Sequence, residues 1–297
     1  MSLEGSSRLG SSLSVASVHV AVNTWFAPVS EIPIVVVAGV DAELFLQGQL
    51  SQDIAGMISG EVKWTMVLEP DGKLGWLGWV LRRDTDSFVL IGSESNVEVL
   101  AARLRRFKLR VKVEIEIKPS WISRTTAPAG SEDGGIPLPF LESGVEISQQ
   151  IFSSAPPLHT GVEALSAESI AQALVRGPSV LPMDAEDGMN PYELGGNIVA
   201  QCVSFEKGCY TGQELVARLD ARGANVPQRL CGFEARSTVA FGEELFDGDE
   251  AVGSVRRHFF DAETGRARGL CLLKRKVNLE TTTSLISRES PVQVFSL

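Results

Sequence analysis

The residues best suited to chemistry in this sequence lie together in the segment 207–214. Gly208 and Gly212 flank Cys209, and Lys207 stands immediately before the first glycine. Glycine allows a backbone to adopt a positive φ or to lie close against a ligand. A thiolate is favoured over a thiol beside a lysine and near the positive end of a helix. The segment therefore predicts a tight loop that presents a reactive or redox thiol, and the alternative is that Cys209 is a small buried hydrophobe.

A helix is expected directly after this loop. Beyond Gly212, apolar residues recur at the spacing of one helix face. Thr211 is followed three residues later by Glu214, which is the pattern of a capping box at a helix N-terminus. Such a start would bring the positive end of the helix close to Cys209, and the alternative is that Glu214 does nothing but cap.

Two segments carry a resemblance to a known family. Residues 207–214 read K-G-C-Y-T-G-Q-E and resemble the K-G-C-Y-x-G-Q-E signature of the YgfZ-type folate-binding proteins. These proteins are relatives of the glycine-cleavage T protein, a tetrahydrofolate-dependent aminomethyltransferase. Residues 41–53 resemble the D-A-x-x-F-L-Q-G-Q-x-T-x-D segment of the same family, with Ser51 in place of the usual threonine.

The resemblance implies a binding site for tetrahydrofolate or a one-carbon derivative. Cys209 would be its reactive or redox thiol, and Lys207 would lower the pKa of that thiol or hold the folate carboxylates. Glu193 stands in a Pro-Tyr-Glu element that matches the family's P-x-E, so its carboxylate is a candidate to pair with two donors of the pterin, the alternative being an exposed loop acid. The other candidate folate-binding residues are Tyr210, Gln213, Glu214, Arg218, Arg222 and Trp76.

A β-hairpin with three tryptophans is expected at 62–81, because Pro-Asp-Gly at its centre favours a tight turn. Trp64, Trp76 and Trp79 would line a flat apolar pocket for a pterin ring, or they are cross-strand core pairs. T proteins carry an acidic residue shortly after this turn, whereas residues 75–79 read G-W-L-G-W. The missing carboxylate argues against aminomethyl transfer.

The pattern of elements predicts an α+β, T-protein-like fold, with two mixed α/β subdomains around a folate-binding cleft and a small C-terminal β-barrel. The N-terminal part is expected as a flexible tail at 1–30, and the barrel at 228–297. The folate-binding α+β region between them spans 31–225. Its inner ferredoxin-like subdomain is expected at about 60–118, where the apolar spacing from Val97 to Phe107 predicts an amphipathic helix. The remainder of the region is expected at 31–59 and 119–225. Within that remainder the sequence predicts a connector at 120–157 with one or two short strands, such as Val145 to Ile147, and a helix from Ser166 to Arg176.

The composition limits the partners. The 297 residues carry a formal net charge of −10, which argues against direct nucleic-acid binding because that affinity comes mostly from neutralised phosphates. No apolar run approaches the roughly 20 residues that span a membrane. The four cysteines form no C-x-x-C and stand far from the histidines, so no metal site is expected. We expect a cytoplasmic monomer with free thiols and no membrane contact.

The resemblance and the composition together favour a tetrahydrofolate-binding factor that supports assembly or repair of iron–sulfur enzymes. Its partners would be iron–sulfur proteins or their assembly machinery, and its effect on tRNA modification would be indirect. One alternative is a tetrahydrofolate-dependent aminomethyltransferase or demethylase. The other is a non-catalytic folate-binding scaffold.

Overall fold

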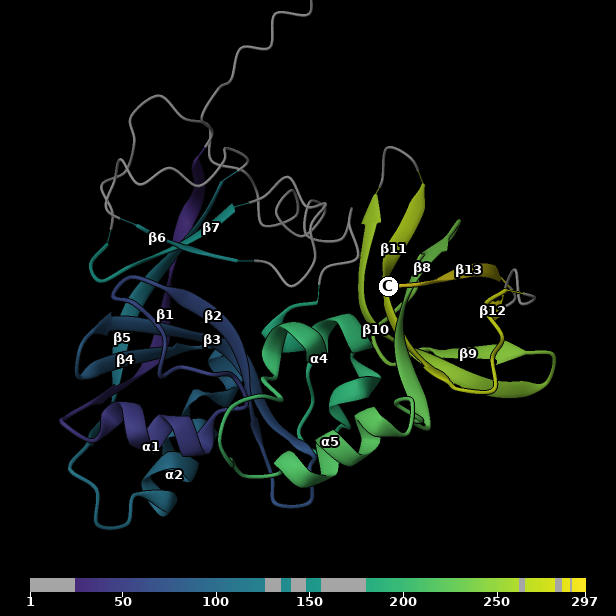
Figure 1. The fold of residues 1–297 in the computed structure, drawn as a ribbon. Helices are drawn as coiled ribbons and strands as arrows, with labels where there is room; N and C mark the ends of the chain where they lie inside the picture. Colours follow the sequence, from purple (N-terminus) through teal and green to yellow (C-terminus); the bar gives the residue numbers. More distant parts are fainter. Residues whose placement is uncertain are drawn as a thin grey trace, which may run out of the picture.

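The described residues form a seven-stranded sheet that is packed against helices, called the sheet unit below, and a closed barrel (Figure 1). The computed structural model describes residues 25–125, 135–139, 148–155, 180–261, 265–280, 285–288 and 290–297. The seven strands of the sheet, in spatial order, are β2 (Val62–Leu68), β3 (Leu74–Asp84), β4 (Ser87–Ile91), β1 (Trp25–Ala38), β5 (Glu114–Thr125), β7 (Ser148–Phe152) and β6 (Ile136–Leu138). Neighbouring strands are antiparallel throughout, which agrees with the predicted α+β class.

Strand β1 joins the parts of the sheet that are distant in sequence. It lies between β4 and β5 and pairs with both. Its run 34–37 is apolar without alternation because both faces of the sheet are covered: Val35 and Val37 pack on one face, and Ile34 and Val36 pack on the other. The strands expected for an inner subdomain at 60–118 therefore share a single sheet with β1.

Two helices cover one face of the sheet. They are α1 (Ala42–Gln49) and α2 (Val97–Phe107), and the one-turn η1 (Glu94–Asn96) leads into α2. Phe45 and Leu46 of α1 and Leu100 and Leu104 of α2 are buried in the same core as Val35. Helix α2 occupies the stretch that its apolar spacing predicts.

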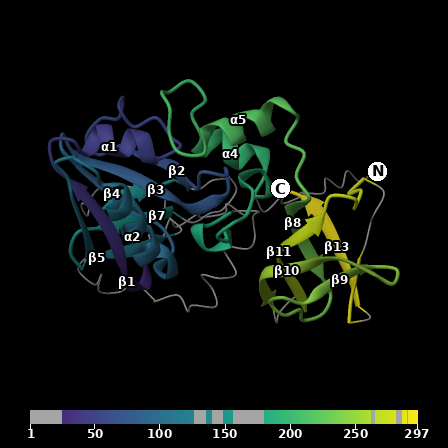
Figure 2. The same ribbon diagram turned by 90° about the horizontal axis from the view of Figure 1, so that it is seen from below.

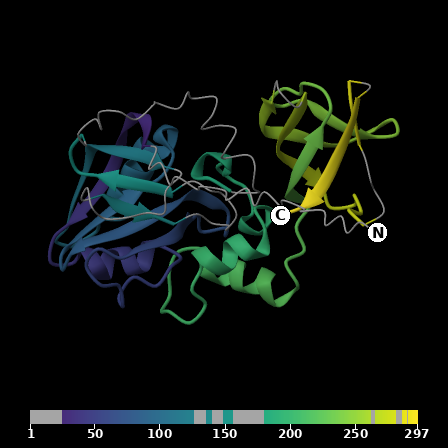
Figure 3. The ribbon, with the colours of Figure 1, turned by 90° about the horizontal axis from the view of Figure 1, so that it is seen from above.

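The opposite face of the sheet packs against the second half of the chain. Four short elements lie there: η3 (Pro182–Asp184), η4 (Pro191–Glu193), α4 (Gly196–Cys202) and α5 (Gln213–Ala221). Figure 2 and Figure 3 show α4 and α5 between the sheet and the barrel. Leu230, Leu270 and Leu272 on the outer surface of the barrel belong to the same core as Ile198 of α4, so a continuous apolar layer joins the two units.

The barrel is closed by six strands. In spatial order they are β10 (Glu250–Asp261), β11 (Arg266–Lys274), β8 (Gln228–Ala235), β13 (Ser290–Ser296), β12 (Leu285–Ser287) and β9 (Glu244–Asp247). Its interior holds a separate apolar cluster that includes Phe233, Val255 and Leu273. A buried ion pair fastens the barrel to the sheet unit: the Arg257 guanidinium lies 3.1 Å from the Asp184 carboxylate. Burial raises the pKa of Asp184, and the charge of Arg257 opposes this rise.

Several local expectations need correction. Residues 25–30, which we expected in a flexible tail, begin strand β1. Residues 1–24 and the expected helix at 166–176 lie outside the described residues. The connector holds two short strands, β6 and β7, as expected, and they form the edge of the sheet. By contrast, α4, η3, η4 and β12 were not expected. The sequence pattern missed these elements because none exceeds seven residues, too few to establish a period.

Candidate functional site

The signature loop at 204–212 is fastened to the end of α1 by Lys207. Its ammonium group donates hydrogen bonds to the backbone carbonyls of Gln47, Leu50 and Gln52, at 2.6, 2.8 and 2.9 Å. These carbonyls lie in and just after the last turn of α1, where the helix dipole favours a positive charge. Burial lowers the pKa of Lys207 to about 8, and the Asp53 carboxylate opposes this. Both segments that carry the family resemblance thus meet at one lysine.

This arrangement opposes one of the roles predicted for Lys207. An ammonium group has three protons to donate, and all three point to backbone carbonyls. None is left over for a folate carboxylate in this arrangement. The structure thus assigns Lys207 a positioning role, and its effect on the thiol of Cys209 stays a prediction.

Ser51 strengthens the same junction. Its hydroxyl is fully buried, donates to the Cys202 carbonyl at 2.7 Å and accepts from the Met66 amide at 2.9 Å. The Ser204 amide donates to the Ser51 carbonyl at 2.9 Å, and the Thr211 amide donates to the Gly48 carbonyl at 3.3 Å. A serine supplies both hydrogen bonds of the side chain, so replacing the usual threonine costs none of the polar contacts seen here.

The backbone conformation at position 212 and its surroundings require a glycine. It has φ +80°, and a Cβ at this position would lie 2.6 Å from the Glu69 carbonyl oxygen of the β2–β3 turn. The capping box predicted for Thr211 and Glu214 is wrong. Gly212 is the N-cap of α5 and has no side-chain cap, while Glu214 forms an exposed ion pair with Arg218 at 2.6 Å. Helix α5 therefore begins after a glycine because the β2–β3 turn lies against the backbone at that position.

Cys209 is an exposed free cysteine in this loop, between the exposed Gly208 and the buried Tyr210. Its accessibility agrees with a reactive thiol and excludes the buried-hydrophobe alternative. Tyr210 is buried, and burial raises its pKa to about 12. Its ring centroid lies 5.1 Å from the Lys207 ammonium, and its hydroxyl is a buried polar atom without a hydrogen-bond partner in the described structure.

Glu193 is a buried acid and not an exposed loop acid. It ends the 3-10 turn η4, where one carboxylate oxygen accepts from the Asn190 amide at 3.0 Å. Asn190 in turn accepts from the Tyr192 amide at 3.0 Å, which completes a capping box. The hydroxyl of Tyr192 donates to Asp220 of α5. Burial, followed by this hydrogen bond, raises the pKa of Tyr192 well above its ordinary value.

The tryptophans separate onto two faces of the sheet. Trp64 and Trp79 are directly opposite in β2 and β3, with ring centroids 4.2 Å apart, and the Trp79 indole donates to the Pro139 carbonyl at 2.7 Å. Trp76 is buried in the other core, beside α1 and α2. The expected pocket of three tryptophans is therefore wrong for Trp76, because residues an odd number apart in a strand point to opposite faces. The indole nitrogen of Trp64 is buried without a hydrogen-bond partner in the described structure.

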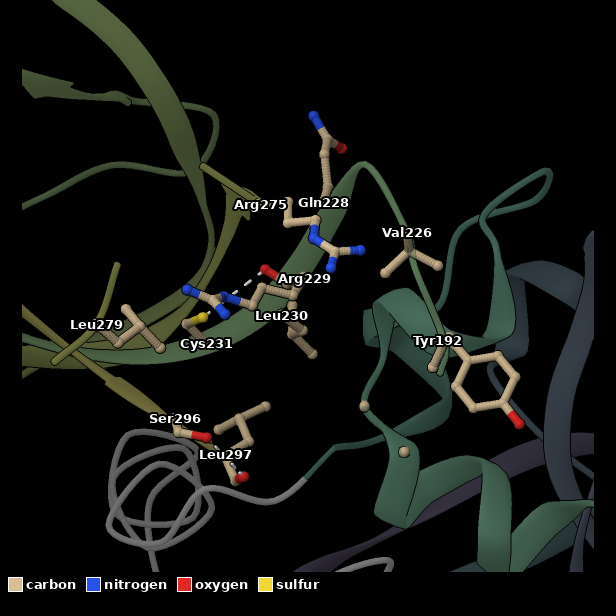
Figure 4. A pocket seen from close by; sticks show the side chains of 13 residues that line it. Tyr192, Val226, Gln228, Arg229, Leu230, Cys231, Arg275, Leu279, Ser296 and Leu297 are labelled. Atoms are coloured by element: carbon tan, nitrogen blue, oxygen red, sulfur yellow. Dashed lines mark hydrogen bonds between the residues drawn. The ribbon is translucent and has the colours of Figure 1, made fainter. Parts of the chain in front are cut away.

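A pocket of about 320 Å³ lies where η4 and α4 meet the end of the barrel (Figure 4). Its positive charges are Arg229 and Arg275. The guanidinium of Arg229 donates one hydrogen bond to the Val277 carbonyl, and its buried Nε has no hydrogen-bond partner in the described part of the chain. The remaining lining residues are Tyr192, Gly195, Gly196, Ala224, Val226, Gln228, Leu230, Cys231, Leu279, Ser296 and Leu297.

The pocket does not contain the residues singled out from the sequence. It includes Tyr192, which is the immediate neighbour of Glu193 in the sequence. The ring of Tyr192 points away from the cavity in Figure 4. Cys209, Lys207, Tyr210, Gln213, Glu214, Arg218, Arg222 and Trp76 do not line it. Gln213 is half-buried at the start of α5, and Arg222 is exposed at its end. The only sequence signal for the pocket was the pair of polar residues at 228–229 that opens a barrel strand.

No group of three or more metal-ligating side chains occurs in the part of the chain that the structure describes. No helix among the described residues is long and apolar enough to cross a membrane.

Comparisons with known proteins agree with the resemblance of the two segments. No protein-family model matches the chain. The chain is 26% identical over 275 residues to the tRNA-modifying protein YgfZ of Vibrio vulnificus, covering 84% of this chain and 83% of that protein. It is 22% identical to the tRNA-modifying protein YgfZ of Vibrio atlanticus, with 91% and 89% coverage. A protein of Haemophilus influenzae described as uncharacterized is 28% identical over 202 residues, covering 67% of this chain and 70% of that protein.

A solved structure shares the fold of this chain. The glycine cleavage system aminomethyltransferase T from Bartonella henselae has a TM-score of 0.63 to this chain at 16% identity, covering 89% of this chain and 83% of the other. The chain is thus similar to the YgfZ proteins over most of its length, and its fold is T-protein-like. In this chain the segments 41–53 and 204–212 are in direct hydrogen-bonded contact, so the residues that carry the resemblance form one structural unit.

Proposed function

We propose that this protein binds tetrahydrofolate or a one-carbon derivative of it. The observation that carries the proposal is the pocket beside η4, whose volume of about 320 Å³ lies in the range of small-molecule sites. A folate has carboxylates at one end and a ring with several hydrogen-bond donors at the other. Arg229 and Arg275 suit the carboxylates, since guanidinium groups bind them in a bidentate manner. Glu193 does not line the pocket, so its pairing with the ring donors is a separate proposal that rests on the family resemblance.

We propose further that the folate-bound protein supports assembly or repair of iron–sulfur enzymes in the cytoplasm. Its partners would be iron–sulfur proteins or their assembly machinery. Cys209 would supply a thiol for this work, and its exposure in a loop held by Lys207 supports that role. The Vibrio relatives are described as tRNA-modifying proteins. The net charge of −10 favours an indirect effect of this protein on tRNA. We propose that the protein acts as a monomer.

The T-protein-like fold favours aminomethyl transfer as the second candidate. Against it, residues 75–79 of the hairpin hold no carboxylate, and Glu69 at the turn is already paired with Arg103 at 2.8 Å. Transfer of a one-carbon unit from a methylamine donor to tetrahydrofolate, if abolished by Glu193→Ala, would establish this second candidate.

Calorimetric titration with tetrahydrofolate and 5-formyltetrahydrofolate tests the first proposal. We expect Arg229→Met to weaken binding about tenfold or more, equivalent to about 1.4 kcal/mol. The matched control is Arg236→Met, which removes an exposed arginine outside the pocket. Cys209→Ser should leave binding intact and abolish support of an iron–sulfur enzyme in cells. Absence of binding by the unaltered protein would refute the folate site. Full cellular activity of Cys209→Ser would favour the scaffold alternative.

A further inference from the structure

Two of the four cysteines stand directly opposite each other inside the barrel. Cys231 of β8 and Cys271 of β11 are paired in the register of these antiparallel strands. Both are free, both are buried, and both belong to the interior cluster of the barrel, so their side chains share one face. Directly opposite residues of an antiparallel pair have Cα atoms about 4.5–5.5 Å apart. Disulfides need Cα separations of about 4.4–6.8 Å, so the backbone already satisfies this requirement.

The pair has an approach from outside through Cys231. This residue lines the pocket at the end of the barrel, whereas Cys271 does not (Figure 4). Burial raises the pKa of Cys231 to about 11, and the nearby charge of Arg229 acts in the opposite direction. Burial also raises the pKa of Cys271 well above its ordinary value, and the proximity of Cys231 adds to this rise. Cys231 is therefore the thiol of the pair that a small solute in the pocket meets first.

We propose that Cys231 and Cys271 form a redox-modifiable dithiol that closes to a reversible disulfide when a small peroxide enters the pocket. Formation of this disulfide requires neither a bound folate nor Cys209, whereas its effect on ligand binding rests on the proposed folate pocket. In the first step the Cys231 sulfur attacks one peroxide oxygen, the O–O bond breaks, and a sulfenic acid and one water form. In the second step the Cys271 sulfur displaces the hydroxyl group of the sulfenic acid as water. The two thiols lose two electrons and two protons, and hydrogen peroxide is reduced to two waters.

The disulfide would act on the pocket. It would link β8 to β11 one position beyond Leu230 and two beyond Arg229, both of which line the cavity. A covalent link at this point limits the movement of the strand that carries the arginine. The oxidation state of the pair would therefore adjust the binding properties of the pocket.

Free-thiol counting in the full-length Cys209→Ser protein tests the proposal, since this variant removes the exposed thiol and keeps the three buried ones. After hydrogen peroxide treatment and denaturation, we expect the count to fall from three to one and to return to three with dithiothreitol. Peptide mapping should join Cys231 to Cys271 and leave Cys202 as the free thiol. In Cys209→Ser/Cys271→Ser, dimedone should trap a sulfenic acid at Cys231.

Retention of all three thiols, or irreversible oxidation without a cross-link, would overturn the proposal. A cross-link that includes Cys202 would overturn it equally. Peptide mapping of the Cys209→Ser protein decides the outcome by itself if the double variant fails to fold.

Discussion

Replacing Lys207 by methionine tests whether this lysine holds the signature loop in place. A hydrogen bond from a charged donor contributes about 1.5–3 kcal/mol. The bond to Leu50 is fully buried, and the bonds to Gln47 and Gln52 are partly buried. Counting the first in full and the others at about 1 kcal/mol each gives about 3.5–5 kcal/mol. Methionine recovers part of this through its apolar side chain, about 1–2 kcal/mol, so we expect the free energy of unfolding to fall by about 3 kcal/mol.

The assay is urea unfolding of the unaltered protein and of Lys207→Met, followed by circular dichroism. The matched control is Lys73→Met, which removes an exposed lysine from the hairpin turn and should change stability by less than about 0.5 kcal/mol. Native-state hydrogen exchange supplies a local measurement. The amides of Ser204 and Thr211 bond to the end of α1, and both should exchange faster in Lys207→Met.

Two results would refute this reasoning. The first is a loss of stability in Lys207→Met no larger than in the control. The second is unchanged protection of Ser204 and Thr211, which would mean that the loop does not depend on the lysine. If Lys207 acts instead only on the thiol of Cys209, the variant would keep its stability and shift the alkylation rate of that thiol toward higher pH.

Three further predictions follow from the same structure. Gly212→Ala should lose about 1 kcal/mol more stability in urea unfolding than Gly223→Ala. Both glycines have positive φ, but only a Cβ at position 212 would lie 2.6 Å from a backbone oxygen. Equal losses in the two variants would contradict this close approach. Asp184→Asn should lose about 3 kcal/mol because it removes the negative charge from a largely buried ion pair with Arg257, whereas Glu186→Gln, whose ion pair is more exposed, should lose under 1 kcal/mol. The folded chain holds the Lys207 proton only to about pH 8, and the unfolded chain holds it to about pH 10.4. The unfolded state therefore binds more protons in this window, and the free energy of unfolding should rise with pH relative to Lys207→Met, by up to about 3 kcal/mol; a flat difference between the two proteins would contradict the lowered pKa.

The sequence by itself determined the elements whose residues repeat with a regular period. Helix α2 occupies the apolar pattern at 97–107, and the hairpin of β2 and β3 forms around Pro-Asp-Gly. Periodicity is a local property, so side-chain spacing and turn chemistry are enough to predict it. The separation of Trp76 from Trp79 was also present in the sequence, since three positions along a strand reverse the face.

Only the tertiary structure decided which side chains meet. Lys207 finds its acceptors 155–160 residues earlier in the chain, and Cys231 faces Cys271 only because β8 pairs with β11 in one particular register. The same holds for the pocket, where Arg229 and Arg275 of the barrel meet the η4–α4 turn. No local pattern specifies these contacts, because they depend on how the sheet unit and the barrel bury their shared apolar layer. The sequence determined the loop that presents Cys209, and packing against α1 and the hairpin turn decided what holds that loop in place.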